Sequence, residues 1–152
     1  MQALVCAMLL LTCICITMST QAPQSAATSL LDKAHDALTA KEPGWKITNK
    51  ESSGNRTTYR WEMAGLGKAE IHVFTTDSPN EAAAALQKRM NMVQVGPTAE
   101  LKNLGDEAYI WKGPNHDTGI IRFRKGNFVI EVNATKSAIA EKFSAYAAEA
   151  MP

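Results

Sequence analysis

Apolar and polar residues alternate most regularly in the C-terminal third of the chain, over residues 120–132. The apolar members of this alternation are Ile121, Phe123, Phe128, Ile130 and Val132. A period of two is typical of strands with one buried face. A two-residue turn at 125–126 or at 126–127 places all five side chains on the same face. The pattern therefore predicts a β-hairpin.

The same alternation predicts four more strands, over residues 45–51, 56–64, 68–75 and 108–112. A glycine-rich loop at 65–67 joins the second and third of them, and its length predicts that Trp61 lies opposite Ile71. This register also places Glu62 opposite Glu70, which is slightly unfavourable because like charges then face each other.

Three segments have the apolar spacing of amphipathic helices. The first covers residues 25–40. The second begins with Ser78, Pro79 and Glu81, which combine an N-cap, a proline at the first helical position and a capping box. The third follows Thr135, which we expect to be its N-cap.

The order of predicted elements is α-βββ-α-βββ-α, which indicates two similar halves. Short hairpin loops require antiparallel neighbours. We therefore expect an α+β fold with a single antiparallel sheet of five to six strands and helices packed on its apolar face. Residues 25–152 provide one domain of this kind.

Residues 1–22 have the character of an export signal, because an apolar run over 3–18 is followed by small polar residues. Cleavage after Ala22 and cleavage after Ala27 are both compatible with the sequence. An uncleaved signal would become a membrane anchor. The residues Leu10–Cys13 loosely resemble a bacterial lipid-attachment motif, with a threonine where that motif has a smaller residue before the cysteine.

Composition excludes several classes of function. The cysteines are Cys6, Cys13 and Cys15, so a processed chain has none for disulfides or thiolate metal sites. A formal net charge of +1 gives no global attraction to nucleic acid or membranes. Residues 125–129 are superficially similar to an RNA-recognition strand but lack its exposed aromatic residues, so we expect no nucleic-acid partner.

No catalytic or metal-binding motif is present. His35, His72 and His116 are scattered, and their spacing does not indicate a metal site. His116 precedes Asp117 within ordinary polar turn residues, which favours a loop over an acid–base pair. We therefore expect no cofactor and no enzymatic activity.

The distinctive chemistry lies on the sheet face opposite the helices. We expect that face to carry basic side chains, with the apolar residues Phe74, Ile110 and Val129 between them. The candidate ligand-binding residues are Arg60, His72, Lys112, Arg122 and Arg124. Arginines on rigid strands suit carboxylate or phosphate groups because guanidinium is a planar fork of donors. The alternative is a solvated face on which Glu62, Glu70 and Glu131 neutralise the arginines.

Two motifs, Leu-Gly-Asp-Glu-Ala-Tyr at 104–109 and Ile-Arg-Phe-Arg-Lys-Gly-Asn at 121–127, resemble a group of uncharacterised exported bacterial proteins. More remotely, the C-terminal third resembles the extracellular sensor domains of bacterial serine/threonine kinases and lipoproteins. The resemblance implies an extracytoplasmic α+β domain.

These observations predict a secreted or periplasmic binding or interaction module for an unknown small anionic ligand or an envelope protein. Contact with a membrane would occur only through an uncleaved or lipidated N-terminus. The alternative is a small cell-envelope enzyme that uses His72 or His116 with a neighbouring acid. A third class, an inhibitor-like protein, would act through the loop 113–119.

Overall fold

The computed structural model describes residues 21–152, so most of the expected export signal and all three cysteines lie outside the described residues. The elements are α1 (Gln21–Lys41), β1 (Lys46–Ser53), β2 (Arg56–Met63), β3 (Gly67–Thr75), α2 (Pro79–Asn91), β4 (Ala99–Glu100), β5 (Glu107–Lys112), a 3₁₀ turn (Pro114–His116), β6 (Gly119–Lys125), β7 (Phe128–Ala134) and α3 (Ser137–Ala150). This order differs from the predicted α-βββ-α-βββ-α by two additional short elements, β4 and the 3₁₀ turn.

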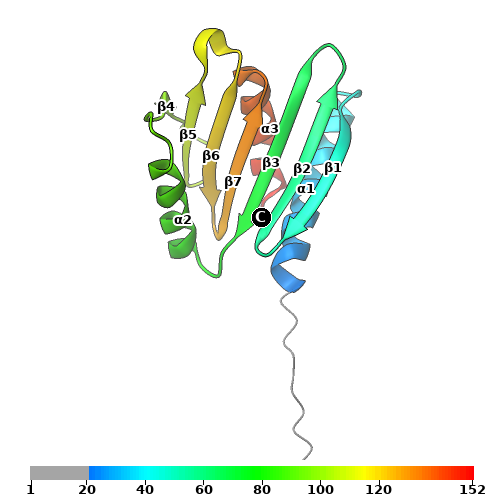
Figure 1. Ribbon diagram of the computed structural model, residues 1–152. Coiled ribbons are helices and arrows are strands. Elements are labelled where there is room, and N and C mark those ends of the chain that lie inside the picture. The colour runs from blue at the N-terminus through cyan, green and yellow to red at the C-terminus, as the bar shows by residue number, and fades with distance from the viewer. Residues whose placement is uncertain (1–20) are drawn as a thin grey trace, which may run out of the picture.

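All strands belong to one antiparallel sheet with the order β1-β2-β3-β7-β6-β5-β4 (Figure 1). The α+β fold with a single antiparallel sheet is therefore confirmed. The sheet has seven strands instead of five or six, because the two-residue strand β4 pairs with β5. Two three-stranded meanders, β1-β2-β3 and β5-β6-β7, meet where β3 pairs with β7.

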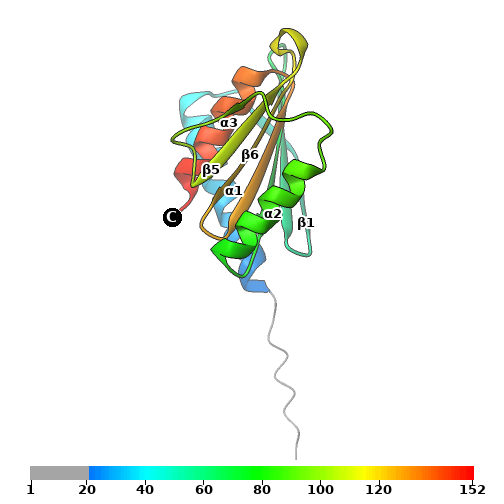
Figure 2. The same cartoon turned by 90° about the vertical axis from the view of Figure 1, so that its left-hand side faces the viewer.

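The main core lies between the sheet and the pair α1 and α3, which cover one face (Figure 2). The large residues that we expected to point inward together do so. They are Tyr59, Trp61, Ile71, Val73, Phe123 and Ile130. Trp61 and Trp45 both contact Phe143 of α3 edge to face. This core is built from strand residues of both meanders, so neither half forms it alone.

Helix α2 packs on the other face of the sheet, which corrects the expectation that all helices share the apolar face (Figure 2). Its inward residues Ala82 and Leu86 are fully buried against Val129, with Phe74 and Tyr109 beside them. These sheet residues form a second apolar patch, whose burial against α2 removes it from water. The second face is therefore half covered.

The register between β2 and β3 differs by two residues from the expected one. Trp61 pairs with Ala69, and the loop is 64–66, closed by a hydrogen bond from the Leu66 N–H to the Met63 carbonyl of 3.1 Å. A shift of two keeps each side chain on its face. It also places Arg60 opposite Glu70 and removes the unfavourable contact between glutamates.

The β6–β7 turn occupies Gly126 and Asn127, the second of the two expected positions, and Gly126 has a φ of 56°. Positive φ is readily adopted by glycine, so this residue allows the two-residue connection.

Helix starts follow the sequence signals at α2 but not at α3. The Ser78 hydroxyl accepts a hydrogen bond of 3.2 Å from the Glu81 N–H, as expected. In contrast, the N-cap of α3 is Lys136. The Thr135 hydroxyl instead accepts from the Lys68 N–H at 3.0 Å, because β7 ends beside the start of β3.

Helix α1 is anchored from its first turns. Ala27 is buried in the main core, and the Gln24 side-chain amide donates to the Gly54 carbonyl at 2.7 Å. Within residues 21–152, no helix has the length and apolar character needed to cross a lipid bilayer.

These contacts predict that processing after Ala22 gives a more stable protein than processing after Ala27. A chain that begins at Pro23 keeps Gln24 and Ala27, whereas one that begins at Thr28 loses both. We expect the shorter chain to lose about 1–2 kcal/mol of unfolding free energy in urea denaturation. Equal stability of the two chains would contradict this anchoring.

Candidate functional site

Four of the five candidate residues lie on the second sheet face, and Lys112 does not. Strand β5 places Ile110 opposite Ile121 in the main core, so Lys112, two residues further, points to the same side. Its ammonium lies 2.8 Å from the Glu141 carboxylate of α3. The expectation that Lys112 and Ile110 belong to the basic face was therefore wrong.

Arg122 is enclosed between the sheet and α2. Its Nε donates to Glu131 at 2.6 Å and its Nη1 donates to the Arg89 carbonyl at 2.7 Å. Only 12% of the side chain is exposed. Burial alone would raise the pKa of the Glu131 carboxyl, but Arg122 and the amide of Asn133 hold it below its ordinary value. Arg122 thus ties β6, β7 and α2 together.

Arg124 is paired in the same way with carboxylates at the start of β5. Its Nε lies 3.1 Å from Glu107 and its Nη1 lies 3.2 Å from Asp106. Glu107 also accepts from the Tyr109 hydroxyl at 2.8 Å. The alternative of cross-strand neutralisation therefore describes Arg122 and Arg124 better than a free basic surface does.

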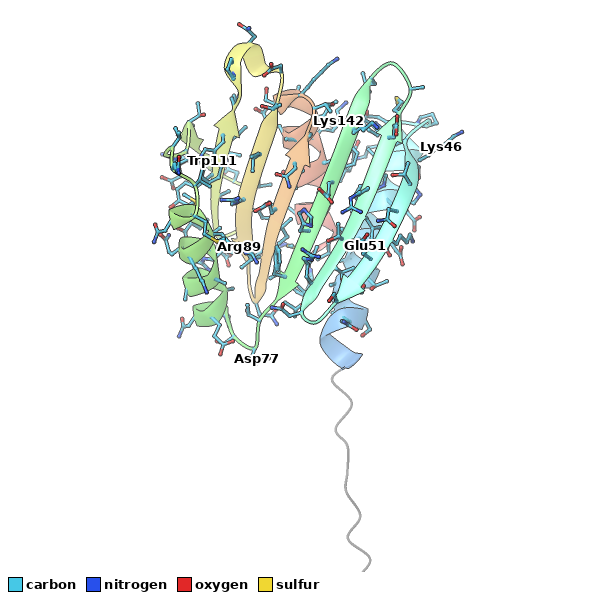
Figure 3. All side chains as sticks on the ribbon, viewed as in Figure 1. Lys46, Glu51, Asp77, Arg89, Trp111 and Lys142 are labelled. Atoms are coloured by element: carbon cyan, nitrogen blue, oxygen red, sulfur yellow. The ribbon has the colours of Figure 1, made fainter. Side chains whose placement is uncertain are left out.

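Beyond α2, the second face is uncovered over β1, β2 and β3, and we call this region the open face (Figure 3). Its side chains include Thr58, Arg60, Glu62, Glu70 and His72. Arg60 donates to Glu70 at 2.6 Å and to Glu51 at 3.1 Å, yet 42% of its side chain remains exposed. Glu62 is paired with Lys68 at 3.3 Å. The open face therefore combines accessible cations and anions.

His72 lies within this network. Its Nδ1 is 2.8 Å from the Thr58 hydroxyl, and its Nε2 is 3.3 Å from Glu70. Burial lowers the pKa of His72 despite the opposing effects of Glu70 and Glu131, so the ring is neutral at pH 7. A hydroxyl, an imidazole and a carboxylate in sequence resemble a nucleophile with its base. However, Thr58 is only 1% exposed, so its hydroxyl cannot reach a substrate.

The open face is hollowed at the end that carries Arg60. This hollow has a volume of about 420 Å³. Its polar lining comes from Thr48, Arg60, Glu62, Lys68, Glu70, Thr118, Asn133 and Thr135. A larger groove of about 660 Å³ lies between α1 and the end of α3, where its lining includes Leu30, Phe128 and Met151. We place the candidate site at the smaller hollow because convergent polar groups give a ligand its orientation.

Two arginines at the margin of α2, Arg56 and Arg89, were missed by the sequence analysis. Arg89 follows Leu86 by three positions and is therefore on the inward side of α2. The spacing alone shows that Arg89 faces inward from the helix. It does not show which face of the sheet α2 covers, and therefore which residues Arg89 meets.

Within residues 21–152, no group of three or more His, Cys, Asp or Glu side chains is placed to hold a metal ion. The side chain of His116 is outside the described part of the structure, so its expected loop role stays a prediction.

Comparison with known proteins gives a likeness of fold. No family model and no curated protein matches the chain. A crystal structure of a GTP binding regulator from Thermotoga maritima is similar, with a TM-score of 0.54 and 16% sequence identity. The match covers 82% of this chain and 88% of that one.

The lowered pKa of His72 predicts a specific pH dependence of stability. Below about pH 6.5 the unfolded chain binds a proton at this position, whereas the folded chain resists it, so the unfolding free energy falls as pH falls. We expect His72→Gln to lose less stability than the wild type between pH 7.5 and 5.5 in urea denaturation. The ion-paired carboxylates change the unfolding free energy only at lower pH, because their pKa values lie below about 4.5. Identical losses in both proteins would contradict the burial of a neutral imidazole.

Proposed function

We propose that the protein is a binding module without catalytic activity that works outside the cytoplasm and binds its ligand on the open face. The hollow of about 420 Å³ carries this proposal, since its size is typical of small-molecule sites. The apolar run over residues 3–18 supports the location.

Anionic groups are the ligand chemistry that best suits the hollow. Arg60 and Lys68 keep 42% and 68% of their side chains exposed. The partners Glu51 and Glu62 are about half exposed, so a ligand carboxylate or phosphate can replace them, whereas Glu70 stays bonded to the Nε of Arg60 at 2.6 Å. Arg122 and Arg124 are held by their own carboxylates and have structural roles in this proposal.

The competing function is a small envelope enzyme that uses His72 with Glu70. The distance of 3.3 Å between them suits an acid–base pair. The only hydroxyl hydrogen-bonded to His72 within residues 21–152 belongs to the buried Thr58. This arrangement favours binding over nucleophilic catalysis.

Removing the charge of Arg60 tests the binding surface. With a triglutamate peptide at low ionic strength, we expect Arg60→Gln to weaken binding about tenfold in isothermal titration calorimetry, because a charge-assisted hydrogen bond is lost. Lys142→Gln, on α3 across the sheet, is the matched control and should bind as the wild type does. Equal binding by Arg60→Gln would remove the hollow from consideration.

A fusion of residues 1–27 to alkaline phosphatase without its own leader tests the location. The phosphatase requires disulfides, which persist only in oxidising compartments. We expect an active fusion, and loss of activity when Leu10 and Leu11 are both replaced by Asp, because charge interrupts the apolar run. An inactive unmodified fusion would contradict export.

A further inference from the structure

Two guanidinium groups at the margin between α2 and the open face form no ion pair within residues 21–152. Arg89 extends from α2 over the sheet (Figure 3), and its Cζ lies 3.4 Å from the centroid of the Phe74 ring. Arg56 is the direct cross-strand partner of Phe74, so both side chains lie on the same sheet face. Both arginines are therefore neighbours of one phenylalanine.

Stacking on Phe74 fixes the orientation of Arg89 and leaves its donors free. A guanidinium uses its flat face against a ring, whereas its five N–H donors lie in its plane. Across residues 21–152, the Arg89 side chain makes no hydrogen bond and no ion pair. Only its backbone carbonyl is used, as the acceptor for Arg122. A guanidinium group that is fixed in orientation and has unused N–H donors is suited to bind an oxyanion.

The local charges are not balanced. Arg122 and Arg56 both repel the Arg89 guanidinium at this margin, and Glu131 is the carboxylate that attracts it. Glu131 is already bonded to Arg122 at 2.6 Å. Arg89 is therefore left without a carboxylate of its own.

The pKa of Arg89 agrees with an excess of positive charge around it. Burial lowers the pKa of its guanidinium, Glu131 opposes that effect, and Arg122 and Arg56 lower the pKa further. An anion beside Arg89 would offset the repulsion that Arg122 and Arg56 exert on it.

We propose that Arg56 and Arg89 form a binding site for a dianionic group, either a phosphate monoester or a dicarboxylate. Two guanidinium forks match the charge and the several oxygen acceptors of such a group. The inference rests on the proposed function, because it assigns ligand chemistry to the end of the open face opposite the hollow: Arg56 begins β2, whereas Arg60 and Glu62 lie further along the same strand.

The test uses the exported, processed protein labelled with ¹⁵N and titrated with inorganic phosphate or succinate at pH 7.5 and low ionic strength. We expect the Nε–Hε signals of Arg56 and Arg89 to shift on binding. Arg89→Gln should weaken affinity at least about tenfold. The affinity of Arg89→Lys should lie between those of Arg89→Gln and the wild type, because lysine keeps the charge and loses the planar fork of donors.

Lys142→Gln is the control for net charge, since Lys142 lies on α3 across the sheet, where it pairs with Glu42. We expect its affinity for both anions to stay within about twofold of the wild type. Tighter binding of phosphate than of succinate would assign the site to phosphate monoesters, and the reverse order would assign it to dicarboxylates.

The site is refuted if neither anion shifts the two arginine signals, or if Arg89→Gln binds as tightly as the wild type. Shifts confined to Arg60 and Lys68 would also refute it, but would leave the open face as the binding surface. If triglutamate does not bind but phosphate still binds at Arg89, the hollow is ruled out as a ligand site and the dianion site stands.

Discussion

The pairing of β3 with β7 is the contact on which the rest of the fold depends. It joins the two meanders into one sheet, with Val73 opposite Ile130 and Ile71 opposite Val132. All four side chains are buried, so this seam is also the centre of the main core. Because apolar residues of both meanders then face α1 and α3 together, the seam determines which surface is left for α2.

Ion pairs on the second face have mainly structural roles. Arg122 and Arg124 each lie opposite a glutamate on a neighbouring strand and are mostly buried. Partly buried pairs of this kind are costly to break, since removal of one partner leaves a charge with little solvation. The two proposed ligand sites, at the hollow and beside Phe74, therefore lie where ion pairing is exposed or incomplete.

The sequence predicts the faces of β2, β3, β6 and β7 and the position of the β6–β7 turn, because side-chain alternation and glycine requirements are local. A register shift of two residues leaves that alternation unchanged, so the partner of Trp61 was predicted wrongly. The run Tyr109, Ile110 and Trp111 contains no polar residue to show which side faces the core, and Lys112 was misplaced as a result. Recognition of Arg56 and Arg89 requires the tertiary position of α2, which helical periodicity does not provide.

The position of the seam also affects how the chain reaches its folded state. Hairpins β2–β3 and β6–β7 close over a few residues, whereas Val73 and Ile130 lie more than fifty positions apart in sequence. Contacts between distant residues require a larger loss of chain entropy before they stabilise the protein. We therefore expect each meander to collapse rapidly and their association to determine the folding rate, with substitutions at the seam slowing folding more than substitutions at the outer strands.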